Sequence, residues 1–404
     1  MSLEHLKETS IVIVGAGPAG LAMAIALSGM GFRINVIDPK IEKDIKNPSY
    51  DGREIALTHQ SKLYMEKLGI WQDIPEKSIS YIKKAKILDD DSTESILIGD
   101  LIGKDSEIGF LVSNNVIRKS SYDTLLILQE KNKDIKFFFE DEVTDVRNFD
   151  DFSKVELKSG KMLEAKLVIS SDSRFSKIRT LLGIPSEMFD FGRDMLVCSM
   201  KHSKTHDQTA WEWFTYGYTL ALLPMREGFI DGQYESSVIV TMNKQEINNL
   251  LSLDKQRFNE EITKKFKNFF GDMVLTGPCY AYPLISVYPK KFVSERYALI
   301  GDAAVGMHPV TAHGYNFVLK GIKSLTELID EAWQAKEDIA SVSLLNKYNR
   351  KHRAATKPLY LFTKFILAIF TKEVPSAKKI RKIFIKLGRL PFIQKTFTKL
   401  LMKE

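Results

Sequence analysis

The segment that decides the fold is Ile11-Val-Ile-Val14, followed by Gly15-Ala-Gly-Pro-Ala-Gly20. Four apolar, β-branched residues predict a short buried strand, and the stretch from Leu21 to Met30 predicts a helix directly after the glycines. A second strand is expected over 33–37, where it ends at Asp38. The order of strand, glycine loop, helix and strand predicts one βαβ unit.

The glycine loop has the spacing Gly-x-Gly-x-x-Gly that is typical of dinucleotide sites. Gly15 permits the tight turn, Gly17 lets the backbone approach a pyrophosphate at the helix N-terminus, and Gly20 allows close packing of helix on strand. An acid after the second strand can accept hydrogen bonds from an adenosine ribose. The predicted contacts are Gly15, Gly17, Pro18, Ala19, Gly20 and Asp38. This pattern alone does not separate NAD from FAD.

A second segment, far along the chain, favours FAD. A strand over 297–300 ends in Gly301-Asp302, where one carboxylate can accept hydrogen bonds from ribityl hydroxyls. FAD is long enough to need such a second segment, whereas NAD does not need it. The alternative is that Gly301 and Asp302 only turn the chain and cap a helix.

Composition excludes several classes of protein. The 404 residues are 44% hydrophobic, which is ample for real cores, and no repeat or low-complexity tract appears. Cys198 and Cys279 are too few for a disulfide framework or a cysteine-based metal site. The longest apolar run, Leu359 to Phe370, is interrupted by Lys364 and is too short to span a membrane. No charged-then-apolar leader opens the chain, so we expect a cytoplasmic protein. We also expect no bound metal.

Charge is unevenly distributed. Residues 341–404 hold 16 Lys and Arg against only Glu373 and Glu404, so the rest of the chain is mildly acidic although the whole carries +7. This uneven charge distribution does not favour nucleic acid as a binding partner. Apolar residues recur at helical spacing in this tail, for example Ile383, Phe384 and Leu387, which indicates helices. A basic helix docked on an anionic membrane and a helix packed on the protein's own core both remain open.

We expect an α/β fold: a Rossmann-type FAD-binding domain, an inserted mixed β-sheet substrate domain and a C-terminal helical region. Helices are expected over 54–70, 115–131 and 314–336. The FAD-binding domain is assigned residues 1–80, 114–182 and 286–340, the substrate domain residues 81–113 and 183–285, and the basic helices residues 341–404.

Four segments carry a resemblance to a known family. They are Gly15 to Gly20, Asp51-Gly-Arg53-Glu-Ile-Ala-Leu57, Leu167 to Arg179, and Gly301-Asp-Ala-Ala-Val-Gly-Met-His-Pro-Val-Thr-Ala-His-Gly-Tyr-Asn316. In this order the chain resembles the para-hydroxybenzoate-hydroxylase-like flavoprotein monooxygenases, and most of all the ring hydroxylases of ubiquinone biosynthesis. The Thr-Ala-His-Gly version of the last segment resembles the subgroup that acts on demethoxyubiquinol-type intermediates.

The resemblance implies roles for individual residues. Arg53 and Arg118 would reach the ribityl-phosphate region, and Asp302 would bind the ribityl chain. Backbone amides at a helix start would face the anionic edge of the reduced flavin. The residues implied there are Pro309, His313, Gly314, Tyr315 and Asn316, with Pro309 and His313 as the catalytic candidates. A purely structural role remains an alternative for His308 and His313, because a histidine at such a position can simply cap or fill a turn.

Two segments depart from the family pattern. Asp172, Ser176 and Arg179 keep the spacing of the family's Asp-Gly motif, but Ser173 replaces its glycine, which puts the nicotinamide contact in doubt. If that position needs a positive φ, the serine costs about 1 kcal/mol. Trp211-Glu-Trp213-Phe resembles the start of a halogenase signature but lacks its Ile-Pro, so these residues are expected to alternate between pocket and core of a sheet.

The function implied by the resemblance is FAD-dependent hydroxylation of a hydrophobic, prenylated phenol or quinol such as a ubiquinone precursor, with O₂ and NADH or NADPH as co-substrates. Such an enzyme would lie peripherally on a membrane and join a quinone-biosynthesis complex. Two alternatives remain: a flavin-dependent reductase or dehydrogenase of a lipid, and a non-catalytic flavoprotein component of a membrane-associated complex.

Overall fold

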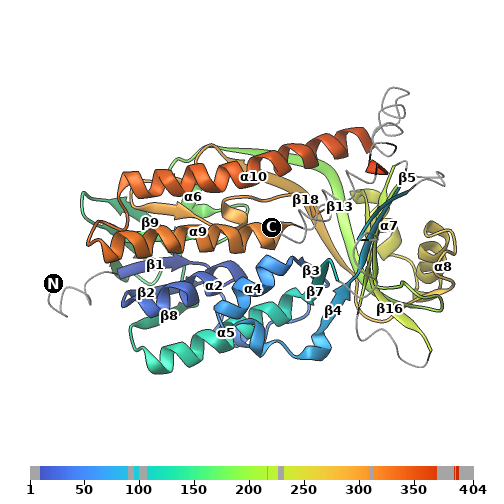
Figure 1. The fold of residues 1–404 in the computed structure, drawn as a ribbon, viewed down its shortest axis with the longest axis horizontal. Coiled ribbons are helices and arrows are strands. Elements are labelled where there is room, and N and C mark those ends of the chain that lie inside the picture. The colour runs from blue at the N-terminus through green and yellow to red at the C-terminus, as the bar shows by residue number, and fades with distance from the viewer. Residues whose placement is uncertain are drawn as a thin grey trace.

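The computed structural model describes residues 10–89, 95–99, 107–215, 217–225, 232–309, 313–370, 386 and 388–390. Figure 1 places a six-stranded sheet with its helices at one end of the molecule and a larger sheet at the other. The two long strands β13 (Ser186–His202) and β18 (Tyr280–Pro289) run between these ends.

The six-stranded sheet contains the predicted βαβ unit. Its order is β19-β20-β12-β1-β2-β8, and every neighbouring pair except β19 and β20 is parallel. The strands are β1 (Ser10–Val14), β2 (Arg33–Asp38), β8 (Ile135–Phe139), β12 (Leu167–Ser170), β19 (Val293–Ser294) and β20 (Tyr297–Leu299). Parallel strands carry their ligands at the carboxyl ends, which is where the glycine loop, residues 171–179 and Gly301 follow.

Helices cover this sheet. They are α2 (Pro18–Leu27), α3 (Glu42–Lys46), α4 (His59–Lys67), α5 (Asn114–Lys131), α6 (Lys177–Leu181), α9 (Gly314–Gln334) and α10 (Val342–Phe370). Buried apolar side chains of β1, α2, α5, α9 and α10 form one continuous core. Tyr348 of α10 donates a hydrogen bond to the carbonyl of Leu299. The described part of the expected C-terminal helices is therefore packed on the fold.

Two small sheets complete this end. One holds β9 (Val143–Asn148), β10 (Ser153–Leu157) and β11 (Met162–Ala165), and the other holds β3 (Glu54–Leu57), β4 (Ile79–Ile82) and β7 (Gly109–Ser113). The expectation of a helix from residue 54 was wrong at its start. Residues 54–57 pair with β7 as a strand, and α4 begins only after Thr58, whose hydroxyl accepts a hydrogen bond from the Ser61 amide.

The second sheet has eight strands, most of them from residues 183–285, for which a substrate domain was predicted. They are β5 (Lys84–Asp89), β6 (Ser95–Ile98), β13, β14 (Thr209–Phe214), β15 (Thr219–Pro224), β16 (Tyr234–Asn243), β17 (Met273–Leu275) and β18. Helices α7 (Lys244–Leu251) and α8 (Lys255–Lys265) lie on its outer face, away from the six-stranded sheet (Figure 1). Trp211, Trp213 and Phe258 belong to the core on that outer side. The inner face is left to meet the FAD-binding domain.

Candidate functional site

One cavity of about 760 Å³ joins the two ends of the molecule. Its lining begins at the glycine loop and Asp38, passes Arg53, Arg118 and Asp302, and ends on the inner face of the eight-stranded sheet. This volume lies within the usual range of small-molecule sites. Residues predicted from widely separated stretches of the sequence therefore line a single site.

The glycines of the loop serve three different needs. Gly15 has φ +104°, and a Cβ there would lie 2.8 Å from the carbonyl oxygen of Ser171. A Cβ on Gly20 would lie 1.8 Å from the Gly15 carbonyl oxygen, so a side chain would force α2 away from the loop. Around Gly17, by contrast, nothing lies within 4 Å of the Cβ position. The loop thus keeps open the space that a pyrophosphate would occupy before the first turn of α2.

Asp38 closes the loop from the second strand. Its side chain is buried, and its two carboxylate oxygens accept hydrogen bonds from the amides of Ala16 (2.7 Å) and Lys40 (2.9 Å). Each carboxylate oxygen has a second lone pair, so a ribose hydroxyl can still be bound. Asp38 therefore both fixes the loop and offers an acceptor to the cavity.

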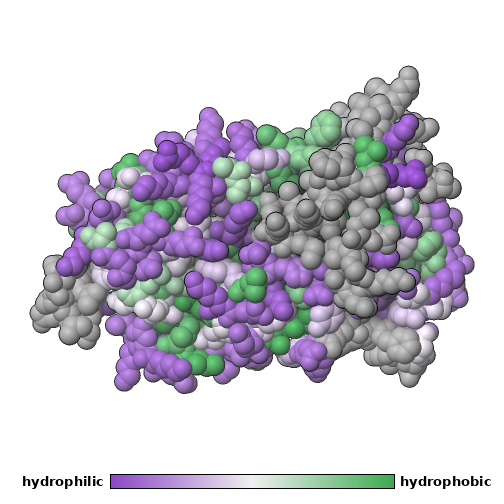
Figure 2. Space-filling view, viewed as in Figure 1, coloured by the Kyte–Doolittle hydropathy of each residue, from purple (hydrophilic) through white to green (hydrophobic). Residues whose placement is uncertain are grey.

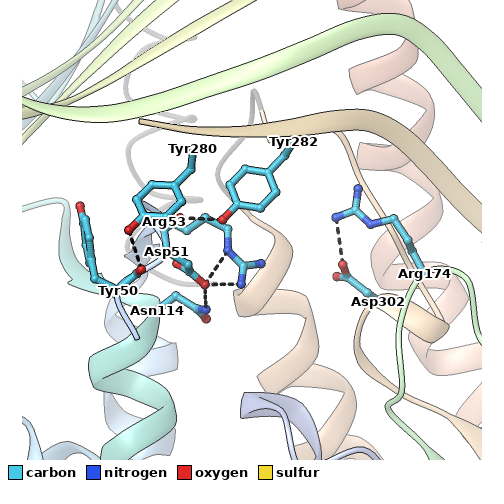
Figure 3. Close-up of polar contacts among 8 residues, drawn as sticks. All are labelled: Tyr50, Asp51, Arg53, Asn114, Arg174, Tyr280, Tyr282 and Asp302. Atoms are coloured by element: carbon cyan, nitrogen blue, oxygen red, sulfur yellow. Dashed lines mark hydrogen bonds and ion pairs between the residues drawn. The ribbon is translucent and has the colours of Figure 1, made fainter. Parts of the chain in front are cut away.

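Residues 50–53 form a clamped turn between the two ends of the site (Figure 3). The hydroxyls of Tyr280 and Tyr282 donate to the carbonyls of Tyr50 (2.8 Å) and Asp51 (2.7 Å). Gly52 has φ +76°, and a Cβ there would lie 2.7 Å from the Tyr280 ring, so only glycine fits. The turn holds Arg53 at the cavity.

Arg53 and Asp51 neutralise one another. The Arg53 guanidinium donates to the Asp51 carboxylate at 2.6 and 3.1 Å, and the Asn114 amide donates to the same carboxylate oxygen at 2.8 Å. Burial opposes ionisation of Asp51, but these hydrogen bonds outweigh it and lower the pKa of the carboxyl. Arg53 consequently reaches the cavity as half of an ion pair.

Arg118 differs from Arg53 in this respect. It lies half-buried on α5 and lines the cavity, and within the described residues its guanidinium forms no ion pair. Burial lowers its pKa, although an arginine stays charged under all ordinary conditions. A half-buried cation without a counter-ion suits an anionic ligand, such as a pyrophosphate.

Asp302 lies where the sequence predicted a ribityl-binding acid, directly after β20. Gly301 before it has φ +64°, and Asp302 stays half-exposed at the cavity wall. Its carboxylate accepts a hydrogen bond from Arg174 at 3.1 Å (Figure 3). Arg174, which the sequence did not single out, also donates to the carbonyl of Ile285 at 3.1 Å and so ties the segment to β18.

The segment with Ser173 is unstrained. Ser173 is not among the non-glycine residues with positive φ, so the serine has no backbone cost, and its hydroxyl accepts a hydrogen bond from the Phe175 amide. Asp172 lines the cavity and accepts from the Lys177 amide at 2.9 Å. Arg179 is buried, and its guanidinium donates to the carbonyls of Ala303 and Arg174. Arg179 therefore holds the Gly-Asp segment in place.

The start of α9 and the residues before it form another part of the cavity wall. His308, Pro309, Gly314 and Tyr315 line the cavity, whereas His313 forms the N-cap of α9. His308 is buried against Phe191, and burial lowers its pKa to about 3, so this ring is neutral. Roles for Pro309 and His313 stay predictions, and residues 310–312 lie outside the described part of the chain.

Asn316 has a packing role in addition to its predicted one. Its side-chain oxygen accepts from the Thr58 amide at 2.9 Å, and its side-chain nitrogen donates to the Ala56 carbonyl at 2.9 Å. These bonds join α9 to the end of β3 and the start of α4. Contact of its backbone amide with a flavin stays a prediction.

Two carboxyl groups that line the cavity, those of Glu54 and Glu212, were not predicted from the sequence. Glu54 accepts hydrogen bonds from Ser113 (2.7 Å) and Tyr50 (3.3 Å), and burial raises its pKa to about 7. Glu212 lies on the inner face of the eight-stranded sheet, and burial raises its pKa to about 8. The signal for Glu212 was a charged residue between Trp211 and Trp213 in an expected strand.

The site fits FAD. Three features line the same cavity, as the parts of that cofactor require: the open space at Gly17, the Arg118 guanidinium, which forms no ion pair within the described residues, and the Asp302 carboxylate. Among the described residues, no cluster of His, Cys, Asp and Glu could hold a metal ion. Fold and site together define a flavoprotein of the FAD-dependent monooxygenase class.

Comparison with known proteins agrees with this class. Residues 8–362 match the model of the FAD binding domain family, and the chain belongs to this family. It is 39% identical over 396 residues to the ubiquinone hydroxylase UbiM of Neisseria meningitidis, covering 97% of this chain and 84% of that one. It is 23% identical to the 3-demethoxyubiquinol 3-hydroxylase of Escherichia coli, covering 93% and 94% of the two chains. The chain is an FAD-dependent monooxygenase.

Solved structures share the fold. The p-nitrophenol 4-monooxygenase PnpA of Pseudomonas putida superposes with a TM-score of 0.74 at 16% identity, covering 98% of this chain and 99% of that one. The Diels-Alderase PyrE3 superposes with a TM-score of 0.72 at 16% identity, covering 98% and 80%. At such low identity these matches confirm the α/β fold with its sheet-based second domain, and no more.

Proposed function

We propose that this enzyme hydroxylates the ring of a hydrophobic, prenylated phenol or quinol, such as a ubiquinone precursor, with O₂ and NADH or NADPH as co-substrates. The observation that carries the proposal is the cavity, which continues from the cofactor segments onto a sheet wall that offers the apolar side chains of Met195, Val197, Ala221, Leu223 and Ile239. Relatives of this chain that are named ubiquinone hydroxylases include UbiL of Rhodospirillum rubrum, which is 26% identical over 379 residues.

Different residues that line the cavity would bind different parts of the cofactor. Gly15 to Gly20, Asp38 and Arg118 would hold the adenine and pyrophosphate parts of FAD, and Asp302 the ribityl chain. When bound, FAD supplies the electron transfer and the activation of O₂. Gly314 and Tyr315, at the start of α9, would place the positive end of the helix dipole at the ring, with Pro309 and His313 as catalytic candidates.

The sheet wall would exclude water from the reacting ring. Met195, Val197 and Ile239 line it and offer apolar contacts to an aromatic ring or a prenyl chain. Excluding water prevents wasteful loss of reactive species. A donor such as NADH or NADPH would bind only transiently, because the sequence carries no second glycine loop. Stopped-flow reduction of the bound flavin by each nucleotide would identify the donor.

Pathway intermediates test the proposal in the cell. A strain that lacks this protein should accumulate a prenylated quinone precursor one ring hydroxyl short, and the intact gene should restore the product. A gene carrying Asp302→Ala should restore it less well. If quinone intermediates are unchanged in the deletion strain, the proposed substrate is wrong.

We also propose that the protein lies on a membrane surface, where it would meet its substrate and a quinone-biosynthesis complex. Leu361 and Phe365 of α10 are half-exposed, as are Met188 and Phe189 of β13. Lys364 connects the two elements, with its Nζ 5.2 Å from the centre of the Phe189 ring. Figure 2 shows hydrophobic surface over the C-terminal half of α10, at the top of the view. The basic residues predicted to assist, such as those of 378–382, lie outside the described part of the chain.

Vesicle binding tests this surface. Among the residues that the structure describes, no helix is long and apolar enough to cross a membrane. Replacing Leu361 and Phe365 by Ser should weaken binding to anionic vesicles, whereas the control Leu63→Ser on exposed α4 should not. Equal vesicle binding of all three proteins would exclude this surface.

A further inference from the structure

The inner face of the eight-stranded sheet presents its residues to the cavity in rows. In the middle row Glu212 pairs with Ala221, Ala221 with Ile239, and Ile239 with Val197 across four strands. All four residues line the cavity, as do Thr219, Thr241 and Met195 of the next row. Glu212 is the ionisable residue of this wall, and its row neighbours are apolar.

The alternation of β14 fixes the direction in which Glu212 points. Trp211 and Trp213 lie on the opposite face, where Trp211 packs against Phe269 and Phe270 with ring centroids 4.9 and 5.5 Å apart. Successive residues of a strand point to opposite faces, so Glu212 must face the cavity. The outer core therefore locks the register of Glu212, because a shift by one residue would bury the carboxyl and expose two tryptophans to the cavity.

This position is energetically unfavourable for the Glu212 carboxyl. Within the described residues its side chain makes no hydrogen bond and no ion pair, and burial is the cause that raises its pKa to about 8. No charged neighbour contributes to this shift. The other ionisable residues that line the cavity are Asp38, Lys40, Arg53, Glu54, Arg118, Asp141, Glu142, Asp172, Arg174, Lys177, Asp302, His308 and Tyr315. A polar group held in apolar surroundings without a partner is unfavourable unless a ligand supplies one.

A second polar group on the same wall lacks a partner. Ser237 lines the cavity on β16, is fully buried, and its hydroxyl has no hydrogen-bond partner. Glu54, the other cavity carboxyl with a raised pKa, already accepts hydrogen bonds from Ser113 and Tyr50. Glu212 is thus the carboxyl that stays available to a ligand on the sheet wall.

We propose that Glu212 is the residue that binds a ring hydroxyl of the substrate and takes its proton during hydroxylation. This role rests on the proposed function. Glu212 acts in its ionised form, which is populated as the pH approaches its pKa of about 8. The hydroxyl O–H bond breaks, the proton forms an O–H bond with a Glu212 carboxylate oxygen, and the electron pair stays on the ring oxygen. That pair raises the electron density of the ring, which favours attack on an electrophilic oxygen atom. Glu212 returns the proton when product leaves.

Binding of two matched probes tests the first half of this role. Oxidised holoprotein is titrated with 2-geranylphenol and with its O-methyl ether, and the flavin absorbance change gives each Kd. The wild type should bind the phenol more tightly than the ether. Glu212→Leu should reduce that ratio by about tenfold, since the ether already lacks the donated hydrogen bond. Glu164→Gln, an exposed position on β11, should leave the ratio unchanged.

Glu212→Gln tests the proton transfer, because an amide oxygen still accepts a hydrogen bond but takes up no proton. The comparison is made at pH 8, near the pKa of about 8 of Glu212. This variant should keep the binding ratio, the FAD content and the rate of flavin reduction, yet hydroxylate about a hundredfold more slowly. An unchanged ratio in Glu212→Leu, or wild-type hydroxylation by Glu212→Gln, would overturn the proposal. If the wild type binds the phenol but hydroxylates no ring, the proposed function fails, while the binding ratio still decides the role of Glu212.

Discussion

Gly17 and Gly20 lie three residues apart in the same loop, yet alanine should affect them in opposite ways. At Gly17 nothing lies within 4 Å of the added Cβ, and its φ of −76° suits alanine. At Gly20 the Cβ would lie 1.8 Å from the Gly15 carbonyl oxygen and 2.6 Å from the Ser171 hydroxyl. Gly17→Ala should therefore keep the stability of the apoprotein, whereas Gly20→Ala should lower it.

The magnitudes follow from what each methyl group displaces. In Gly20→Ala the backbone itself must move, and overpacking of this kind destabilises by about 1–3 kcal/mol or more. In Gly17→Ala the methyl group enters the space of the pyrophosphate and separates it from the amides at the start of α2. The loss of one charge-assisted hydrogen bond costs about 1.5–3 kcal/mol, which weakens FAD binding by roughly 10- to 150-fold.

Two measurements on apoprotein separate these effects: thermal unfolding, and quenching of FAD fluorescence on titration. Gly17→Ala should unfold near the wild-type temperature and bind FAD weakly. Gly20→Ala should unfold at a lower temperature. If Gly17→Ala binds FAD as tightly as the wild type does, the cofactor does not pass over this loop, and the assignment of the site is wrong.

Three other expectations follow from the same site. Asp302→Ala should weaken FAD binding by about 1.5–3 kcal/mol in a fluorescence titration, because a charge-assisted hydrogen bond is lost, and an unchanged Kd would contradict the ribityl assignment. Chelators should leave turnover unchanged, and inhibition reversed by one divalent ion would overturn the mechanism. In substrate-free protein, Glu212 keeps its proton up to a pKa of about 8, whereas the unfolded chain releases it near 4.5, so this residue lowers stability as pH rises between these values. Glu212→Gln should accordingly raise the unfolding temperature more at pH 8 than at pH 5, and an equal effect at both would refute the raised pKa.

The cofactor half of the site could be predicted because its requirements are local. Gly15 and Gly20 are demanded by backbone contacts with the nearest strands, and Asp38 by hydrogen bonds to amides of its own loop. Such constraints leave a fixed spacing in the sequence. The strand after Arg53 was missed because its pairing with β7, 53 to 59 residues later, outweighs the helical pattern of 54–70.

The substrate half could not be predicted in the same way. Arg174 meets Asp302 only through the fold, 128 residues later, and no local pattern marks that pair. Glu212 was visible as a charge between two tryptophans, but only the packing of Trp211 on Phe269 and Phe270 decides which face is the core. Residues whose roles depend on tertiary packing leave ambiguous signals in the sequence.

The central claim is that this flavoprotein places an oxygen atom from O₂ on an aromatic ring. Purified protein loaded with FAD should be incubated with NADH or NADPH, ¹⁸O₂ and a prenylated phenol, and the product analysed by mass spectrometry. One ¹⁸O atom per ring, absent without FAD, is the predicted result. Reduction or dehydrogenation of the substrate without incorporated label, or a protein that binds no FAD, would contradict the account.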